Sequence, residues 1–302
     1  MSPRSHSHDH SSRTRPLAIA LTITTVVLLA ELIGAWISGS LALLSDAMHM
    51  LSDSTGLVLA LIAVVVGKRR ATAEASYGYR RAEVLAAVVN ALLVIVATVW
   101  ILVESVGRLI HGRGEQIDTT VMLIIAVVGL VANAASAAAL HGHAEDNLNI
   151  RGAFLHVLTD LFGSVAVIVA ALVIKMTGWQ GIDAVASLVI VGLVLPRAAQ
   201  LAWNAIGVLM ERAPKGTDPR QVARDIEALD CVRALHDLHI WSTDGVTPLA
   251  SCHVVSKGGD CAAEEDCHVL DKVQEVMRTH GIEHSTVQVE TPSHEHHEDV
   301  HH

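Results

Sequence analysis

The chain has 302 residues, of which 51% are hydrophobic and only 17% are charged. In soluble domains about a quarter of the residues are charged, so this composition indicates a membrane protein and argues against an ordinary soluble domain. The formal net charge of −10 comes from the last third of the chain and does not describe the apolar part. We therefore expect a lipid bilayer, and no nucleic acid, among the partners of this protein.

Six apolar runs follow one another between residues 17 and 210, most of them close to the length that a helix needs to cross a bilayer. They are Leu17–Ile37, Leu41–Val66, Val84–Val106, Thr119–Leu140, Ile150–Ile174 and Ile182–Leu195. The last is expected to continue as a helix past Pro196 to Met210. Because lipid offers no partners for open backbone groups, we predict an all-α, six-helix transmembrane domain over residues 17–210, after a His-rich tail at 1–16.

Positive charges lie mainly in the loops on one side of these spans. They are Arg4, Arg13, Arg15, Lys68, Arg69, Arg70, Arg80, Arg81, Arg151, Arg212 and Lys215. The loops on the other side carry Arg108, Arg113 and Lys175. Because Lys and Arg are retained on the cytoplasmic side, the chain is predicted to be a multi-pass protein with both termini in the cytoplasm.

Residues 211–292 form a polar second unit of small-domain size, followed by a second His-rich tail at 293–302. Asp218 is a candidate N-cap with Pro219 in the first turn, which predicts a helix over Pro219–Leu229. Period and turn signals predict the later elements. They are strands Arg233–Ser242 and Thr247–Ser256, helix Ala262–His280 ended by Gly281, and strand His284–Glu290. The order α-β-β-α-β predicts a small α+β domain with its helices on one face of the sheet.

The same spacing of histidine and aspartate occurs in two of the apolar spans. His49 and Asp53 are four residues apart in the second span, and His156 and Asp160 are four apart in the fifth. Residues four apart share a helix face, one turn from each other, so each span aims an imidazole and a carboxylate at one point. Together they supply two nitrogens and two oxygens, enough to close a tetrahedron around Zn²⁺. Since ionisable groups at membrane depth are costly and mark ion paths, this pattern predicts a transport site for a divalent metal.

Other polar residues in the spans leave alternatives open. Each His/Asp pair on its own could simply cross-link helices, although the repeated spacing favours a metal site. Asp46 shares the helix face of His49 and is either an auxiliary ligand or a residue at the membrane interface. Three polar residues are interpreted as packing or hydrogen-bonding residues, namely Glu31, Asn90 and Asn133. Small residues near the pairs would let helices approach closely, namely Gly56, Gly163 and Ser164.

The second unit offers candidate ligands for a separate, regulatory zinc site. They are His236, His253, His268 and Glu290, with His284 or Cys252 as further possibilities. Exposed surface histidine is the competing interpretation. His236 and His239 are three apart in a predicted strand, so we expect them to face opposite sides. The cysteines form no CxxC pair, which argues against a zinc ribbon, and the His-rich tails are either weak metal gatherers or solvated ends.

Four segments resemble the cation diffusion facilitator family, in particular its bacterial zinc, cadmium and cobalt resistance branch. They are SLALLSDAMHMLSD at 40–53, SYGYRRAEVL at 76–85, FLHVLTDLFGS at 154–164 and HDLHIW at 236–241. The resemblance covers nearly the whole chain apart from its His-rich ends. It implies a six-helix membrane domain, a cytoplasmic ferredoxin-like domain, a homodimer and the exchange of metal for protons.

The same resemblance implies a preference among metals. In this family histidine at both leading positions is the zinc pattern, and here these positions are His49 and His156. Cadmium and cobalt remain open, because ligand chemistry discriminates poorly among such ions. The loop between the fourth and fifth spans is short, whereas eukaryotic relatives often carry a long His-rich loop, so we expect a bacterial inner membrane.

The expected function is proton-coupled efflux of Zn²⁺ from the cytoplasm by alternating access. Metal binding needs neutral imidazole and ionised carboxylate, so protons compete for the same ligands. Zinc in the cytoplasmic domain would brace the dimer. A membrane zinc sensor without transport is the main alternative. An intramembrane metalloprotease would need an open metal position beside a general base, and no HExxH motif occurs in a span. We therefore do not expect an enzyme.

Overall fold

The computed structural model describes the backbone of residues 11–67, 71–112, 116–141, 148–257 and 262–292. Side chains are described for residues 22–52, 65–66, 71–112, 116–138, 157–158, 160–257 and 268–292. Most of the N-terminal tail and all of the C-terminal tail lie outside these residues. The chain divides into two compact units, one of residues 1–59 and 89–200 and the other of residues 60–88 and 201–302.

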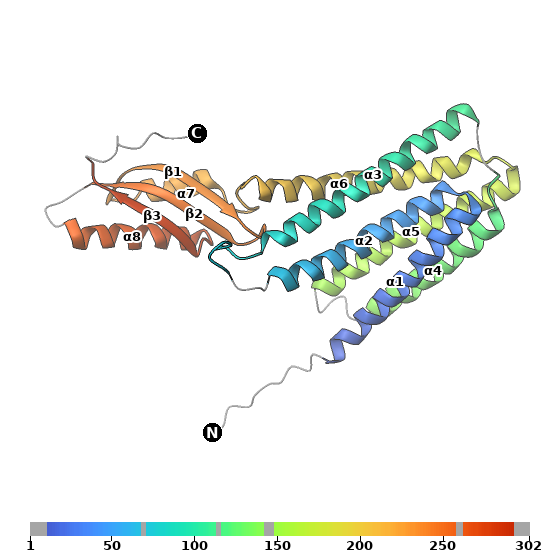
Figure 1. Ribbon diagram of the computed structural model, residues 1–302, viewed down its shortest axis with the longest axis horizontal. Coiled ribbons are helices and arrows are strands. Elements are labelled where there is room, and N and C mark those ends of the chain that lie inside the picture. Colours follow the sequence, from blue (N-terminus) through green and yellow to red (C-terminus); the bar gives the residue numbers. More distant parts are fainter. Residues whose placement is uncertain (1–10, 68–70, 113–115, 142–147, 258–261, 293–302) are drawn as a thin grey trace, which may run out of the picture. The chain divides into compact units, whose positions relative to one another are not determined.

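The first unit is built from long helices (Figure 1). The helices are α1 (Ser11–Ser38), α2 (Leu41–Gly67), α3 (Arg81–His111), α4 (Thr119–His141), α5 (Leu148–Thr177) and α6 (Gly181–Leu209). The ends of α2, α3 and α6 belong to the second unit. Each predicted apolar span lies inside one of these helices, and α6 continues through Pro196 as expected.

Four of these helices satisfy the length and hydropathy of a membrane span over their described residues. The segments are Arg81–His111, Thr119–Ala138, Asp160–Thr177 and Gly181–Leu209, and Thr22–Ser38 is a shorter apolar helix. Large apolar side chains point outward from the helices, among them Trp36, Val96, Ile124, Phe162 and Leu193. Exposed apolar side chains in this number suit lipid rather than water, so the first unit is a transmembrane helical domain.

Inside this unit α4 packs against α1 and α5. The core between the helices mixes large side chains with many alanines, for example Leu43, Met122, Ala126, Val167 and Ala170. Lipid is as apolar as these side chains, so helices associate in it through close packing rather than through the hydrophobic effect. The small residues allow that close packing.

A buried carboxylate holds the beginning of α2. Asp183, near the start of α6, accepts hydrogen bonds from the Ser40 hydroxyl at 2.5 Å and from the backbone N–H groups of Leu41 and Ala42 at 2.7 and 3.2 Å. The first N–H groups of a helix have no partner within it, and here a second helix supplies one. The Asp183 side chain therefore fixes the position of α2 along its own axis.

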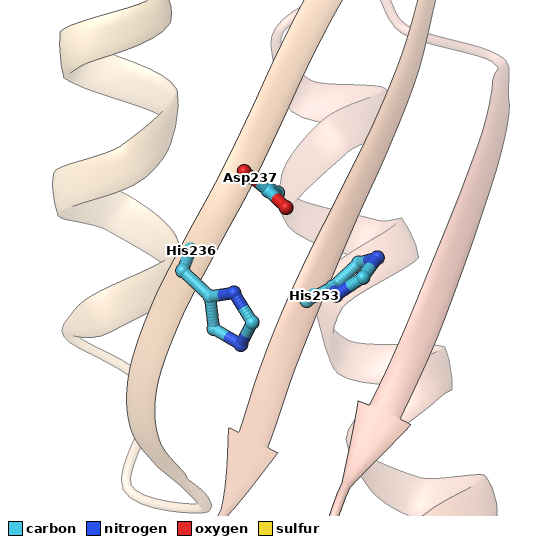
Figure 2. Close-up of side chains that lie close together, drawn as sticks. All are labelled: His236, Asp237 and His253. Atoms are coloured by element: carbon cyan, nitrogen blue, oxygen red, sulfur yellow. The ribbon is translucent and has the colours of Figure 1, made fainter. Parts of the chain in front are cut away.

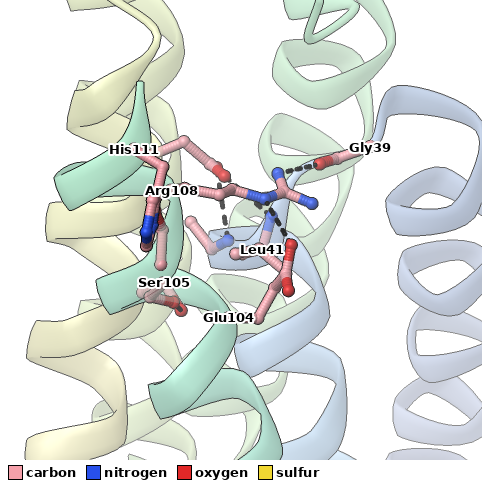
Figure 3. Close-up of polar contacts among 10 residues, drawn as sticks. Gly39, Leu41, Glu104, Ser105, Arg108 and His111 are labelled. Carbon is pink, nitrogen blue, oxygen red and sulfur yellow. Dashed lines mark hydrogen bonds and ion pairs between the residues drawn. The ribbon is translucent and has the colours of Figure 1, made fainter. Parts of the chain in front are cut away.

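The turn before α2 is held from α3 as well (Figure 3). Arg108 donates to the carbonyl oxygen of Gly39 at 2.9 Å and to the Glu104 carboxylate at 3.2 Å. Gly39 has a φ of +71°, a conformation that suits glycine. Ser105 and Ser187 join α3 to α6 through a hydroxyl bond of 3.0 Å. One end of the domain is thus tied together by polar contacts.

Replacing Asp183 by Ala should destabilise the first unit, because three donors at the start of α2 lose their acceptor. We expect a loss of about 2 kcal/mol, somewhat more than one cap is worth. The matched control is Asp118→Ala, since Asp118 caps α4 at an exposed position by accepting from Thr120 and Val121. Thermal unfolding of the detergent-solubilised protein measures both, and equal losses would contradict the role given to Asp183.

The second unit carries a small mixed sheet with two helices. Its elements after α6 are α7 (Pro219–Glu227), β1 (Val232–Ser242), β2 (Pro248–Ser256), α8 (Ala262–Thr279) and β3 (His284–Glu290). The sheet order is β1-β2-β3, with β1 antiparallel and β3 parallel to β2. The predicted order α-β-β-α-β is confirmed.

Local signals in the sequence explain where these helices begin and end. Asp218 accepts from the backbone N–H of Arg220 at 3.0 Å, with Pro219 as the first helical residue. Gly281, with a φ of +77°, follows the end of α8. The core joins Val222 of α7 and Met277 of α8 to alternate residues of β2, namely Ala250, Cys252 and Val254. Both helices therefore cover one face of the sheet.

Candidate metal centre

The two spans with the His/Asp spacing meet inside the first unit. His49 of α2 and Asp160 of α5 are both buried, and the Nε2 atom of His49 lies 3.5 Å from an oxygen of Asp160. The histidine and the aspartate come from different pairs, so one member of each pair reaches the same place. The side chains of the other two predicted ligands, Asp53 and His156, lie outside the described residues.

Asp46 lies one turn before His49 on the same side of α2. It is 2% exposed, so it is buried rather than at an exposed interface. The hydroxyl of Ser164 on α5 donates to Asp46 at 3.5 Å. A Cβ atom added to Gly163 would overlap the other oxygen of Asp46. The small residues Gly163 and Ser164 thus let α5 approach α2, as predicted from the sequence.

Glu31 of α1 is a third buried carboxylate in this part of the molecule. It is fully buried, and within the described part of the chain neither of its oxygens has a hydrogen-bond partner. The sequence predicts a packing or hydrogen-bonding role for Glu31, and no hydrogen bond is formed within the described part of the chain. One of its oxygens lies beside Gly129 of α4, where an added Cβ would come within 2.8 Å.

A second group of ligand-type side chains lies on the sheet of the second unit (Figure 2). His236 of β1 and His253 of β2 are directly paired across the strands, and their ring centroids are 5.0 Å apart. Glu290, the last residue of β3, is 3.2 Å from Nε2 of His236 and 3.0 Å from Nδ1 of His253. Because His253 alternates with the core residues of β2, this group lies on the face that the helices leave open.

A β-bulge adds one residue to this group. His236 pairs with His253 and His239 pairs with Ser251, so three steps on β1 oppose two on β2. The expectation that His236 and His239 face opposite sides is therefore wrong. Asp237, inside the bulge, has a φ of +49°, which an aspartate tolerates better than most residues. Ligand atoms of His236, Asp237 and His253 lie within 4.8 Å of one another.

The protonation of this group suits a metal ligand set. Burial raises the pKa of Glu290, but hydrogen bonds from His236 and Gln288 and the charge of the nearby histidines outweigh it, so the pKa lies below its usual value. Glu290 is then ionised at neutral pH, as metal binding requires. Cys252 points into the core instead, where burial raises the pKa of its thiol to about 12.

The remaining candidates from the sequence lie elsewhere in the second unit. His268 is exposed on α8. His284 is exposed at the opposite end of β3 from Glu290, where it pairs with Leu249. The structure brings together His236, His253 and Glu290. It adds Asp237, which residue spacing does not predict because the spacing does not reveal a bulge.

Comparison with known proteins accounts for both units. Residues 17–210 match the cation efflux transmembrane domain, and residues 214–292 match the cation efflux protein cytoplasmic domain. The chain belongs to the cation efflux family. This is a family of transporters and not of enzymes. Because the two matched models are a transmembrane and a cytoplasmic domain, the chain is a membrane protein with a cytoplasmic domain.

Relatives in three bacteria cover most of the chain. A cadmium, cobalt and zinc/H(+)-K(+) antiporter of Bacillus subtilis is 40% identical over 90% of this chain and 87% of its own length. The metal cation efflux system protein CzcD of Cupriavidus metallidurans is 39% identical over 89% of this chain and 84% of its own. The zinc transporter ZitB of Escherichia coli is 40% identical over the same shares. The resemblance to the bacterial branch of the family is confirmed.

The close approach of α5 to α2 predicts a contrast between two helical glycines. Gly163→Ala should push Asp46 away and destabilise the first unit by about 1–3 kcal/mol, the usual cost of overpacking. Gly192→Ala is the matched control, because an added Cβ on α6 meets nothing within 4 Å. Thermal unfolding in detergent compares the two. If Gly163→Ala unfolds no earlier than Gly192→Ala, the packing described here is wrong.

Proposed function

We propose that this protein exports Zn²⁺ from the cytoplasm in exchange for protons, through a tetrahedral site of His49, Asp53, His156 and Asp160. The observation that carries the proposal is the approach of His49 to Asp160 inside the helical domain. An imidazole and a carboxylate from two helices, both buried at membrane depth, are costly unless they bind an ion or a proton.

The register of α2 and α5 supports the full set of four ligands. Asp46 meets Ser164, and His49, one turn later on α2, meets Asp160, one turn earlier on α5. The two helices therefore run antiparallel where they touch. One further turn in the same register takes α2 to Asp53 and α5 to His156. Both pairs would then converge on one metal ion.

The proposed ligands couple metal to protons in a direct way. Zn²⁺ needs neutral imidazole and ionised carboxylate. With the site open to the cytoplasm, the metal displaces protons and binds. After the helices rearrange to open outward, protons compete with the metal for the imidazole nitrogens. The protonated site releases the metal and returns. The B. subtilis relative is named an antiporter of zinc, cadmium and cobalt, so Cd²⁺ and Co²⁺ are further proposed substrates.

The proposed setting follows from the same family. We propose six membrane spans in a bacterial inner membrane, both termini in the cytoplasm, a ferredoxin-like cytoplasmic domain and a homodimer. The positive loop charges in the sequence support the orientation. The matches to the transmembrane and cytoplasmic domains of cation efflux proteins support the proposed membrane spans and cytoplasmic domain.

We further propose that His236, His253 and Glu290, together with Asp237, bind a regulatory zinc ion in the cytoplasmic domain. The side chains of His236 and His253 are 20% and 21% exposed, so the site is reachable from solvent. Metal there would brace the sheet and favour one conformation of the dimer, because a ligand shifts a population by its differential affinity.

Asp160→Asn should abolish transport, since the amide keeps the shape but lacks the charge that binds the metal. The assay loads purified protein into sealed vesicles with a zinc-sensitive and a pH-sensitive dye inside. Zinc entry with proton exit in the native protein, and neither in the variant, is the expected result. Asp118→Asn, an exposed cap of α4, is the control and should transport normally. Native protein that binds zinc yet moves none would overturn the transporter in favour of a sensor.

The cytoplasmic site predicts a separate change in zinc binding. His236→Ala and His253→Ala should each weaken one class of bound zinc at least about tenfold, because the loss of even an outer-shell partner costs that much. His284→Ala is the matched control, being an exposed histidine on the same sheet. Competition with a zinc-binding dye measures the full chain. Three variants with the same affinity as the native protein would rule this site out.

A further inference from the structure

Glu31 poses a question that the metal ligands do not answer. It is a fully buried carboxyl group on α1 with no hydrogen bond to either oxygen among the described residues. Buried polar groups nearly always have a partner. The exposed fraction is zero, so surrounding water does not provide one. The Glu31 carboxyl group therefore needs a bound ion or proton as its partner.

The neighbours of Glu31 come from three helices. Gly129 on α4 leaves room for one Glu31 oxygen, and an added Cβ there would also lie 3.5 Å from the Ser164 hydroxyl of α5. Glu31 and Ser164 thus border the same small space. Ser164 in turn donates to Asp46 of α2. Ser164 therefore lies between the two carboxyl groups, bordering the space beside Glu31 and contacting Asp46.

The charges that act on Glu31 within the described residues are negative. They are the carboxylates of Asp46 on α2 and, through space, Asp160 on α5. The α4 side presents Gly129, and the next titratable group along α2 is His49, which faces Asp160. An ionised Glu31 would be a buried charge with no counter-charge, which is strongly unfavourable. Neutralisation by a positive ion removes that penalty.

The packing around Glu31 favours the smallest positive ion. Gly129 and Gly163 have no side chain because carboxylate oxygens occupy that space. A metal ion needs a shell of several oxygen ligands at about 2.0–2.6 Å, and these tightly packed helices leave little room for one. A proton needs no such shell. It forms an O–H bond on the Glu31 carboxyl itself.

We propose that Glu31 is a proton-binding site of the transport cycle, separate from the four proposed metal ligands. The proposal rests on the proposed antiport. When the metal binds at Asp160, its positive charge adds to the field at Glu31. The O–H bond of Glu31 then breaks, the electron pair stays on the carboxylate, and the proton leaves to water on the open side. When the metal departs, a proton from the other side re-forms that bond.

The test counts protons released per zinc ion bound. Native protein and Glu31→Gln, purified whole in detergent with little buffer, are titrated with zinc while pH is followed. Glutamine has the same shape but never carries an exchangeable acid proton. We expect unchanged zinc stoichiometry and affinity within about threefold, with about one proton fewer released per zinc. Glu104→Gln is the matched control, because Glu104 is half-exposed beside Arg108, and it should release as many protons as native.

Two further results decide the proposal. Glu31→Leu, which replaces the carboxyl by an apolar side chain of similar size, should show the same proton deficit, and this keeps the test valid if Glu31→Gln does not fold. Equal proton release in native and both variants overturns the proposal. A loss of zinc binding in Glu31→Gln also overturns it, since Glu31 would then belong to the metal site. Proton release is measured at equilibrium and does not depend on transport. A native protein that moves no zinc in vesicles would therefore overturn the proposed antiport without changing the proton counts that test Glu31.

Discussion

The meeting of α2 and α5 determines what the membrane domain can do. Lipid offers no hydrogen-bond partners, so a buried polar side chain depends on another helix or on a bound ion or proton. The approach of His49 to Asp160 and the contact of Asp46 with Ser164 both come from one antiparallel interface. Asp46 can lie this close to α5 because position 163 has no side chain. The buried polar residues and the close contact of α2 with α5 therefore depend on each other.

Polar contacts at the start of α2 explain why His49 is held at a fixed height beside α5. Asp183 and Arg108 bind the turn before α2 and its first N–H groups. His49 follows about two helical turns later, which is on the order of 10 Å along the axis. Fixing the first turn of a rigid helix fixes the height of every residue after it. Asp183 and Arg108 have a structural role, yet they govern the position of a proposed metal ligand.

Much of this architecture could be predicted from the sequence, and the roles that could not be predicted share one cause. The apolar runs, the cap at Asp218 and the stop at Gly281 are local signals, and the structure bears them out. The His/Asp spacing identified both helices that meet. Asp183 was missed as a cap because its partner residues are more than 140 positions away. Asp237 was missed because a bulge changes which residues face each other without altering composition. Long-range pairing and local register are set by tertiary packing.

The position of Glu31 bears on how metal and protons compete. Charges interact strongly across a few ångströms of low-dielectric protein. Carboxyl groups at 31 and 46 would therefore sense a cation at the proposed site of Asp160, even without touching it. When they are ionised they favour a divalent ion nearby, and when they are protonated they cease to do so. A site of four ligands can exchange ions by direct competition alone. The additional buried carboxyls would make the metal affinity depend on pH more steeply than the ligands themselves require, which suits a cycle that must bind on one side and release on the other.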